Sequence, residues 1–305
     1  MANSGIRGDR PFIIFMLMPA FFFLIMFYIY PTLFNLQNSF TNLSLFGLKK
    51  GGDWVGIDNY VELVTSNDFR RVLFNTVIWL TLVGVAVRII LGLGLALLLD
   101  SKVLKKYRLT TISRVLLLVP WATSPIVAIV AWRWLLHPLL GDINNALLAI
   151  GVISEPIAFL SDALWVWPAL ITIITWNTLP LVTLTFIASL QSLPAELIEA
   201  AEVDGATKWQ KLRYVIIPHL KPAIIVMVLL STFWTFNNFV YVWLTTAAGP
   251  GLYTNVMATE VYIKAFIDGR MGYSSAVGIV MATIMIAFGM IYLRLIAQRE
   301  FNEVF

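Results

Sequence analysis

Residues 194–218 read PAELIEAAEVDGATKWQKLRYVIIP and form a polar interruption between two long apolar stretches of the chain. Its acidic residues are Glu196, Glu199, Glu202 and Asp204. A membrane-surface loop that binds anionic lipid headgroups is normally basic, so this acidic loop is poorly suited to lipid. The stretch is therefore expected to dock on another protein, through a basic cleft of that protein.

The composition around this loop predicts an all-α, polytopic membrane protein. Apolar residues make up 59% of the chain and charged residues only 12%, far from the average of soluble proteins. An apolar helix needs about 20 residues to cross a bilayer. Six stretches meet this length: roughly 11–33, 75–99, 113–136, 164–190, 222–246 and 275–297.

The distribution of Lys and Arg predicts the orientation. With both termini in the cytoplasm, the cytoplasmic segments hold 13 of the 21 basic residues and the external loops hold 6. The acidic loop, residues 191–221, is then cytoplasmic. The external loop 137–163 contains no Lys or Arg.

A single transmembrane domain over residues 1–305 is expected, because no flexible linker interrupts the pattern. The first apolar stretch is too long for a signal-peptide core and is expected to be retained. The external segment 34–74 contains several glycines and aromatic residues, which predict a folded cap with turns. Small residues at Ser274, Gly278 and Ala282 predict a close helix contact.

The cytoplasmic loop is expected to form two short helices with a tight turn. Pro194 suits the first helical turn, and Gly205 is the residue type that most easily closes a helix in the left-handed conformation. The second helix is expected to run from 206 to 215. An alternative is that the loop is only a solvated connector, whose glutamates keep it soluble.

The spacing in this loop resembles the EAA loop of the membrane subunits of bacterial ABC importers, written E-A-A, three residues, G, nine residues, I-x-L-P. The matching positions here are Glu199, Ala200, Ala201, Gly205, Val215, Ile217 and Pro218. Residues 55–60, 75–76, 132, 141–144 and 247–250 look like the carbohydrate-uptake branch of these importers. Within it, the chain is similar to relatives of the larger membrane subunit of the maltose transporter.

The resemblance implies the type I ABC importer fold in a bacterial inner membrane. It also implies four kinds of partner: a second related membrane subunit, two copies of a cytoplasmic ATPase, an external solute-binding protein and membrane lipid, with no nucleic acid. The ATPase is expected to contact a set of loop residues: Glu196, Glu199, Ala200, Ala201, Asp204, Gly205 and Pro218. In that family the glutamate at the position of Glu199 pairs with an arginine of the ATPase.

No catalysis is expected from this chain itself. It contains no G-x-x-x-x-G-K-[ST] loop to hold nucleotide phosphates, so ATP and Mg²⁺ are expected on the partner ATPase. His137 and His219 lie far apart at segment ends, which argues against a metal site or a nucleophile with its base. The chain is expected to bind no cofactor.

The fifth apolar stretch is expected to carry a sugar site. Ser231, Trp234 or Thr235, and Asn238 fall at helical steps of three and four, and such groups bind sugar hydroxyls and cover sugar rings. The alternative is that they only bond neighbouring helices. By resemblance to the maltose subunit, the site residues are Ser231, Trp234, Thr235, Asn238, Asn177, Thr178 and Leu181.

Several alternatives stay open at this point. Arg88, near the middle of the second stretch, is expected to form a buried ion pair with the partner subunit, or else to attract an anionic cargo such as a sugar acid or glycerol phosphate. Arg133 is expected to reach the outer interface. Two other classes are an ion-coupled secondary carrier, for which no central acidic residue is seen, and a membrane scaffold.

Overall fold

The computed structural model describes residues 10–101 and 110–304. No β-strand occurs in these two ranges, apart from two isolated bridges, so the all-α prediction is confirmed. The α-helices are α2 (Arg10–Leu24), α3 (Tyr30–Asn38), α4 (Asp58–Thr65), α5 (Asn67–Phe74), α6 (Gly84–Leu99), α8 (Thr110–Ala122), α9 (Pro125–Leu135), α10 (Asp142–Ala149), α11 (Val166–Gln191), α12 (Ala195–Val203), α13 (Lys208–Lys211), α14 (Ile217–Phe236), α15 (Val240–Thr246), α16 (Met257–Tyr262) and α17 (Met271–Val304).

Short π-helical segments join several of these helices into longer ones. The π-helical segments are η1 (Ile25–Ile29), η3 (Asn75–Val83), η4 (Leu212–Ile216) and η5 (Ile263–Ile267). The segment η2 (Leu45–Gly47) is instead a single 3-10 turn. With these joints, five helices within the described ranges are long and apolar enough to cross a membrane, or six if the bent pair α8 and α9 counts as one span. The expected number of spans is therefore met only with that pair included.

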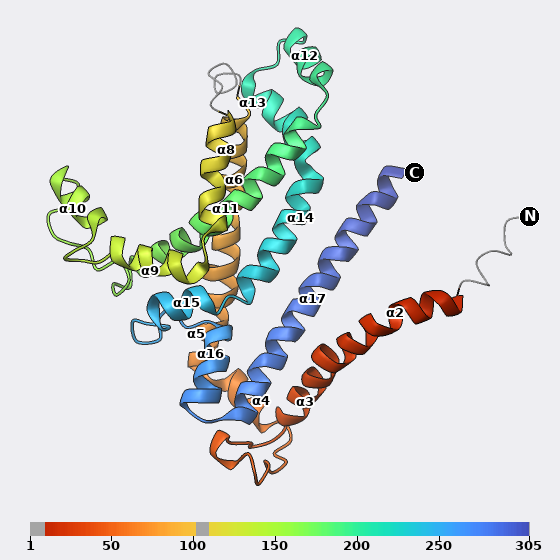
Figure 1. Cartoon of the computed structure of the whole chain (residues 1–305), viewed down its shortest axis with the longest axis vertical. Helices are drawn as coiled ribbons and strands as arrows, with labels where there is room; N and C mark the ends of the chain where they lie inside the picture. The colour runs from red at the N-terminus through yellow and green to blue at the C-terminus, as the bar shows by residue number, and fades with distance from the viewer. Residues whose placement is uncertain (1–9, 102–109, 305) are drawn as a thin grey trace, which may run out of the picture. The chain divides into compact units, whose positions relative to one another are not determined.

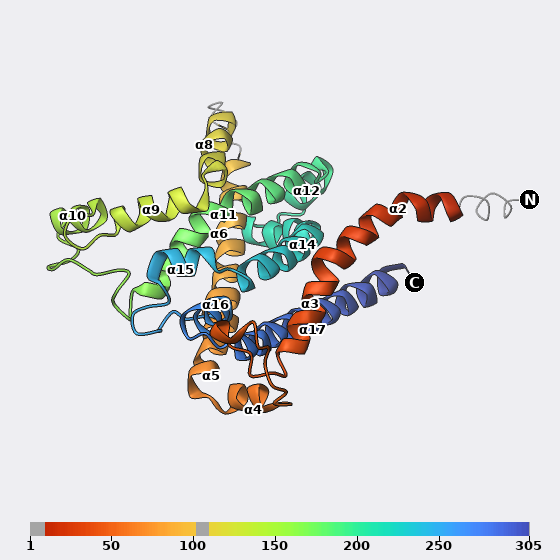
Figure 2. The same cartoon turned by 60° about the horizontal axis from the view of Figure 1, so that its bottom comes forward.

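The third predicted span, 113–136, is not one straight helix. Helices α8 and α9 meet at an angle of 98° (Figures 1 and 2). Pro125 is the first residue of α9, and Ser124 before it has an extended conformation with ψ of 137°. A proline disfavours helical geometry in the residue that precedes it, which ends α8 here. The predicted span 113–136 is therefore present as two helices joined by a bend.

The fifth predicted span, 222–246, differs from the prediction at both ends. Helix α14 ends at Phe236, and α15 begins only at Val240. Asparagine stabilises helix ends better than helix interiors, and the Asn238 Oδ1 accepts a hydrogen bond from the Tyr241 N–H at 3.1 Å. The pair Asn237 and Asn238 therefore marks a break, so Asn238 does not share a continuous helical face with Ser231.

The chain divides into two compact units, each formed by segments distant in sequence. One comprises residues 1–66 and 260–286, and the other comprises 67–259 and 287–305. In the second unit, α11 packs against α6, α8 and α14. The approach of α6 to α11 is close, since a Cβ on Gly92 would lie 2.7 Å from Val182. Tryptophans 79 and 167 stack in the core of this unit, with ring centroids 6.0 Å apart.

In the first unit, the segment 39–57 folds against the start of α17, as a cap with turns. The Gly272 N–H donates to the Leu43 carbonyl at 2.9 Å, and the Leu45 N–H donates to the Gly269 carbonyl at 2.8 Å. Gly272 has no room for a side chain, because a Cβ would collide with the Thr41 carbonyl. Of the predicted small-residue stripe, Ser274 donates to the Val261 carbonyl and Gly278 faces Asn35.

A bidentate ion pair in the first unit predicts a pH-dependent stability. Both guanidinium Nη atoms of Arg270 donate to the Glu62 carboxylate, at 2.7 and 2.5 Å. These hydrogen bonds hold the pKa of Glu62 below its ordinary value of 4.5. A carboxylate with a lowered folded pKa stabilises the fold fully above its unfolded pKa, and this is lost as the pH falls through the folded pKa.

We therefore expect Glu62→Gln to lower the thermal midpoint of the assembled protein at pH 7 and to have no effect well below pH 4.5. Both side chains are about half exposed, so the loss at neutral pH is at most about 1 kcal/mol. Thermal unfolding followed over a pH series measures this difference. An equal deficit at acidic and neutral pH would contradict the ionic origin.

Candidate functional site

The acidic loop 191–221 contains the expected first helix, α12, closed by Gly205. Gly205 has a φ of +75°, in the left-handed region. Its N–H donates to the Glu202 carbonyl at 3.1 Å, and the Ala206 N–H donates to the Ala201 carbonyl at 2.9 Å. These two bonds form a Schellman motif, which satisfies carbonyls at the end of α12. The predicted turn is present in the structure.

The second helix of the loop differs from the prediction. The helix that starts at Lys208 continues through η4 and α14 to Phe236, a length of 29 residues, so no separate helix 206–215 exists. The wider turn of η4 comes directly before Pro218, whose ring and missing N–H would disturb a regular α-helix. The second half of the loop is thus the beginning of the long helix that forms the fifth span, and Pro218 lies inside this helix.

A cap and an ion pair order the start of the long helix, and the ion pair links it to α12. Thr207 and Gln210 form a capping box, in which each side chain bonds the other residue's backbone N–H. The Lys211 Nζ lies 2.7 Å from the Glu202 Oε1. Glu202 therefore connects α12 to the long helix. The pattern T-x-x-Q at residues 207–210 is a sequence signal for the capping box, which the prediction did not include.

The remaining acidic residues of the loop face solvent. Glu196, Glu199 and Asp204 are exposed, as are Ala200 and Gly205, while Ala201 is half-buried. Beside them lie exposed apolar side chains of Leu197, Val203 and Trp209, of which Val203 is 88% exposed. Figure 1 shows α12 at the end of α11, away from α15. The loop offers an acidic and apolar surface whose role in docking stays a prediction.

A cavity of about 330 Å³ lies within the second unit, among the helices α6, α8, α11 and α14 and the start of α9. Its lining includes five predicted site residues, Arg88 and a second tryptophan: Arg88, Trp121, Thr123, Pro125, Asn177, Thr178, Leu181, Val182, Ser231 and Trp234. Such a volume is at the lower end for small-molecule sites, roughly 300–1,000 Å³. The structure brings together Asn177, Thr178, Leu181, Ser231 and Trp234, whose role in binding stays a prediction.

Two predicted site residues lie outside this lining. The Thr235 side chain is buried and its Oγ1 accepts a hydrogen bond from the Arg88 Nη1 at 3.1 Å. Asn238 bonds the Tyr241 N–H at the break between α14 and α15. The break between the helices thus separates Asn238 from the wall formed by Ser231 and Trp234.

Asn177 joins three elements around the cavity. Its Nδ2 donates to the carbonyls of Pro120 and Thr123, at 2.6 and 3.1 Å, where α8 ends. Its Oδ1 accepts from the Tyr241 hydroxyl of α15 at 2.5 Å. The amide therefore fastens α11 to the bend of the third span and to α15. Thr178 bonds only a carbonyl of its own helix, that of Ile174.

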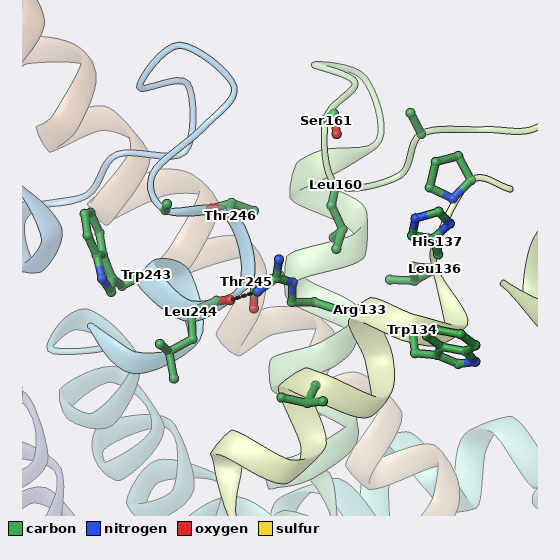
Figure 3. Close-up of a pocket in the computed structure, with 14 residues that line it drawn as sticks. Arg133, Trp134, Leu136, His137, Leu160, Ser161, Trp243, Leu244, Thr245 and Thr246 are labelled. Carbon is green, nitrogen blue, oxygen red and sulfur yellow. Dashed lines mark hydrogen bonds between the residues drawn. The ribbon is translucent and has the colours of Figure 1, made fainter. Parts of the chain in front are cut away.

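A second and larger cavity, of about 700 Å³, lies between α9, α15 and the segment 158–161 (Figure 3). Arg133 points across it, and its Nη1 donates to the Leu244 carbonyl at 3.2 Å (Figure 3). Arg133 is exposed and bonds the backbone of α15. No site residue was predicted in this cavity. Among the described residues, no three His, Cys, Asp or Glu side chains gather as a metal site would require.

Comparison with protein families settles the class of the chain. Residues 88–301 match the family described as binding-protein-dependent transport system inner membrane component. The chain belongs to this family. It is thus a multi-pass inner-membrane component of an ABC transport system, as the EAA resemblance predicted. A transport component is also consistent with the expectation that this permease is not itself an enzyme.

Three relatives cover most of the permease. The sulfoquinovosyl glycerol transport system permease protein of Agrobacterium fabrum is 31% identical over 96% of this chain and 92% of its own length. A probable ABC transporter permease protein of Brucella suis is 32% identical over 79% of this chain and 82% of its own. The maltodextrin transport system permease protein of Bacillus subtilis is 29% identical over 97% of this chain and 70% of its own length.

The fold is also found among solved structures. A chain of a bacterial ABC transporter involved in the import of the acidic polysaccharide alginate superposes with a TM-score of 0.77, at 24% identity. The superposition covers 95% of this permease and 96% of the other chain. The permease therefore has the ABC importer transmembrane fold that the resemblance predicted.

Proposed function

We propose that this permease passes a carbohydrate from an external binding protein into the cytoplasm, and that a separate ATPase drives it by docking on the loop 191–221. The permease would pair with a second, related membrane subunit and with two copies of the ATPase, which would hold ATP and Mg²⁺. Relatives named for maltodextrin and sulfoquinovosyl glycerol support a carbohydrate cargo.

The observation that carries the proposal is one continuous helix. From Lys208 to Phe236 it spans about 43 Å at 1.5 Å per residue, and it connects the docking loop to the cavity. Its first turn is fastened to α12 through Lys211 and Glu202, and near its other end it carries Ser231 and Trp234. A displacement of α12 by a docked ATPase would move the cavity wall directly.

The chemistry of the cavity wall suits a sugar. Trp121 and Trp234 offer aromatic faces, which pack against the apolar side of a sugar ring. The Ser231 hydroxyl is buried and has no hydrogen-bond partner within the described part of the chain. An unpaired buried hydroxyl costs free energy, and a sugar hydroxyl that bonds it would remove this cost.

We expect Trp234→Ala to lower uptake about tenfold while the ATPase stays bound. Trp234 is 52% exposed, so its removal leaves no core cavity, and the loss of one aromatic–sugar contact of about 1.4 kcal/mol corresponds to this factor. The measurement is uptake of labelled sugars into vesicles that contain the whole complex and its binding protein, with ATP inside. Leu230→Ala, on the same helix and also exposed, is the control and should transport normally.

The same vesicles distinguish the alternatives. A carbohydrate importer of this class requires internal ATP and ignores ion gradients, whereas an ion-coupled carrier does the opposite. A scaffold would transport no sugar under either condition. Uptake that persists without ATP, or unchanged uptake by Trp234→Ala, would contradict the proposal.

A further inference from the structure

Arg88 is the most deeply buried cation described in the chain. Its side chain on α6 is 1% exposed, although α6 belongs to a membrane span. One guanidinium nitrogen donates to the neutral hydroxyl of Thr235, and the Nε has no hydrogen-bond partner. Among the described side chains, 12–101 and 112–294, no carboxylate forms an ion pair with it. A buried charge without a counter-ion is costly, and the described part of the chain places no group beside Arg88 that would balance it.

The position of Arg88 shows how a balancing group would arrive. Arg88 lines the cavity of about 330 Å³ and is otherwise enclosed by protein, so a counter-ion would reach it through that cavity. A second unsatisfied group lines the same cavity, the Ser231 hydroxyl, also 1% exposed. A guanidinium whose Nε lacks a partner and an unpaired hydroxyl are donors that a negatively charged oxygen group would accept from.

The other amide and hydroxyl side chains of the wall already have partners, including Thr123, whose hydroxyl bonds the Val119 carbonyl. The amide of Asn177 is engaged at both ends, and the Thr178 hydroxyl bonds its own helix. Hydrogen-bond capacity toward a ligand is therefore concentrated at Arg88 and Ser231. The tryptophans 121 and 234 complete the wall with apolar faces. The cavity combines one charged donor with surfaces that suit a sugar ring.

We propose that the cargo is an anionic carbohydrate, a sugar bearing a carboxylate, sulfonate or phosphate, and that Arg88 binds this anionic group with help from Ser231. The proposal rests on the carbohydrate function stated above and specifies its substrate class. It takes the anionic-cargo alternative for Arg88 in place of the expected buried ion pair with the partner subunit. Arg88 would also select cargo, because a neutral sugar leaves the guanidinium uncompensated.

The test uses the whole complex with its binding protein in vesicles containing ATP. The probes are matched neutral and anionic compounds, such as glucose with glucuronate and glucose 6-phosphate, maltose with its uronic acid form, and a sulfonated hexose. We expect the sugars transported by the unaltered complex to be anionic. Arg88→Gln should lower their uptake by at least tenfold, and Arg88→Lys, which keeps the charge, should restore part of it.

Two further variants keep the test decisive if Arg88→Gln fails to assemble. Ser231→Ala removes only a hydroxyl and should raise the KM for the anionic cargo severalfold. Arg133→Gln is the matched control, since Arg133 is exposed and bonds a backbone carbonyl in the other cavity, and its uptake should be normal. ATP-dependent uptake of neutral sugars alone would overturn this inference and leave the proposed function intact. Uptake of no sugar at all would overturn both.

Discussion

Replacing Gly205 by valine should lower ATP-dependent uptake by a factor of about 5–30 while the permease still inserts and assembles. Gly205 has a φ of +75°, a conformation that costs an L-residue roughly 1–2 kcal/mol, and more for a β-branched one. This cost corresponds to such a factor in the population of the closed turn. The Schellman motif would open, and α12 would no longer hold Glu199 in one orientation for the proposed contact with the ATPase.

The control for this variant is unusually well matched. Gly151 closes α10 with the same motif and a φ of +71°, and the Val152 N–H bonds the Leu147 carbonyl as Ala206 bonds Ala201. Neither glycine has another atom within 4 Å of an added Cβ. Gly151→Val therefore imposes the same backbone strain outside the docking loop. Equal losses of uptake in the two variants would show that strain alone is responsible, and coupling through α12 would be refuted.

Asn177→Leu should destabilise the permease more than any other single change discussed for the cavity. It removes three hydrogen bonds, leaving the carbonyls of Pro120 and Thr123 and the Tyr241 hydroxyl without this partner. The Pro120 carbonyl keeps a hydrogen bond from the Thr123 N–H at 3.2 Å. Each buried polar group left unpaired costs about 1–3 kcal/mol, so the loss of the other two bonds costs about 2–6 kcal/mol. We expect a clear fall in the thermal midpoint of the assembled complex, together with loss of uptake.

Thr178→Val provides the control for Asn177→Leu. Thr178 is the next residue of α11 and lines the same cavity, but its hydroxyl bonds only the Ile174 carbonyl one turn earlier. Its replacement should change the thermal midpoint little. A stable Asn177→Leu complex would mean that the bend between α8 and α9 is held by other contacts. Tyr241→Phe removes a single bond of the network and should fall between the two variants.

The sequence predicted the membrane spans well where hydrophobicity alone decides them. The second and fourth spans occur as continuous helices, and Gly205 closes α12 because few residue types tolerate its conformation. The sequence also contained signals for the two breaks that were missed. Ser124-Pro125 disfavours helix before proline, and Asn237-Asn238 favours a helix end. Both breaks lie within apolar stretches, so a prediction based on the number of consecutive hydrophobic residues does not detect them.

Periodicity within one helix was a poor guide to the lining of the cavity. Ser231, Trp234 or Thr235, and Asn238 were expected to share a face, and of these Ser231 and Trp234 line the cavity. Thr235 bonds Arg88, and Asn238 lies past the end of α14. Similarly, the acidic spacing of the loop did not reveal that Glu202 pairs with Lys211. Which of several similar side chains is free depends on its neighbours in space.

The sequence by itself determined the class of this protein. An apolar composition, the distribution of basic residues and the E-A-A loop with its glycine are local properties, and the bilayer and the backbone impose them directly. Only the tertiary structure decided what Arg88 does in the chain. Whether a buried cation has a counter-ion depends on helices far apart in sequence, and here the folded chain places no described carboxylate beside it.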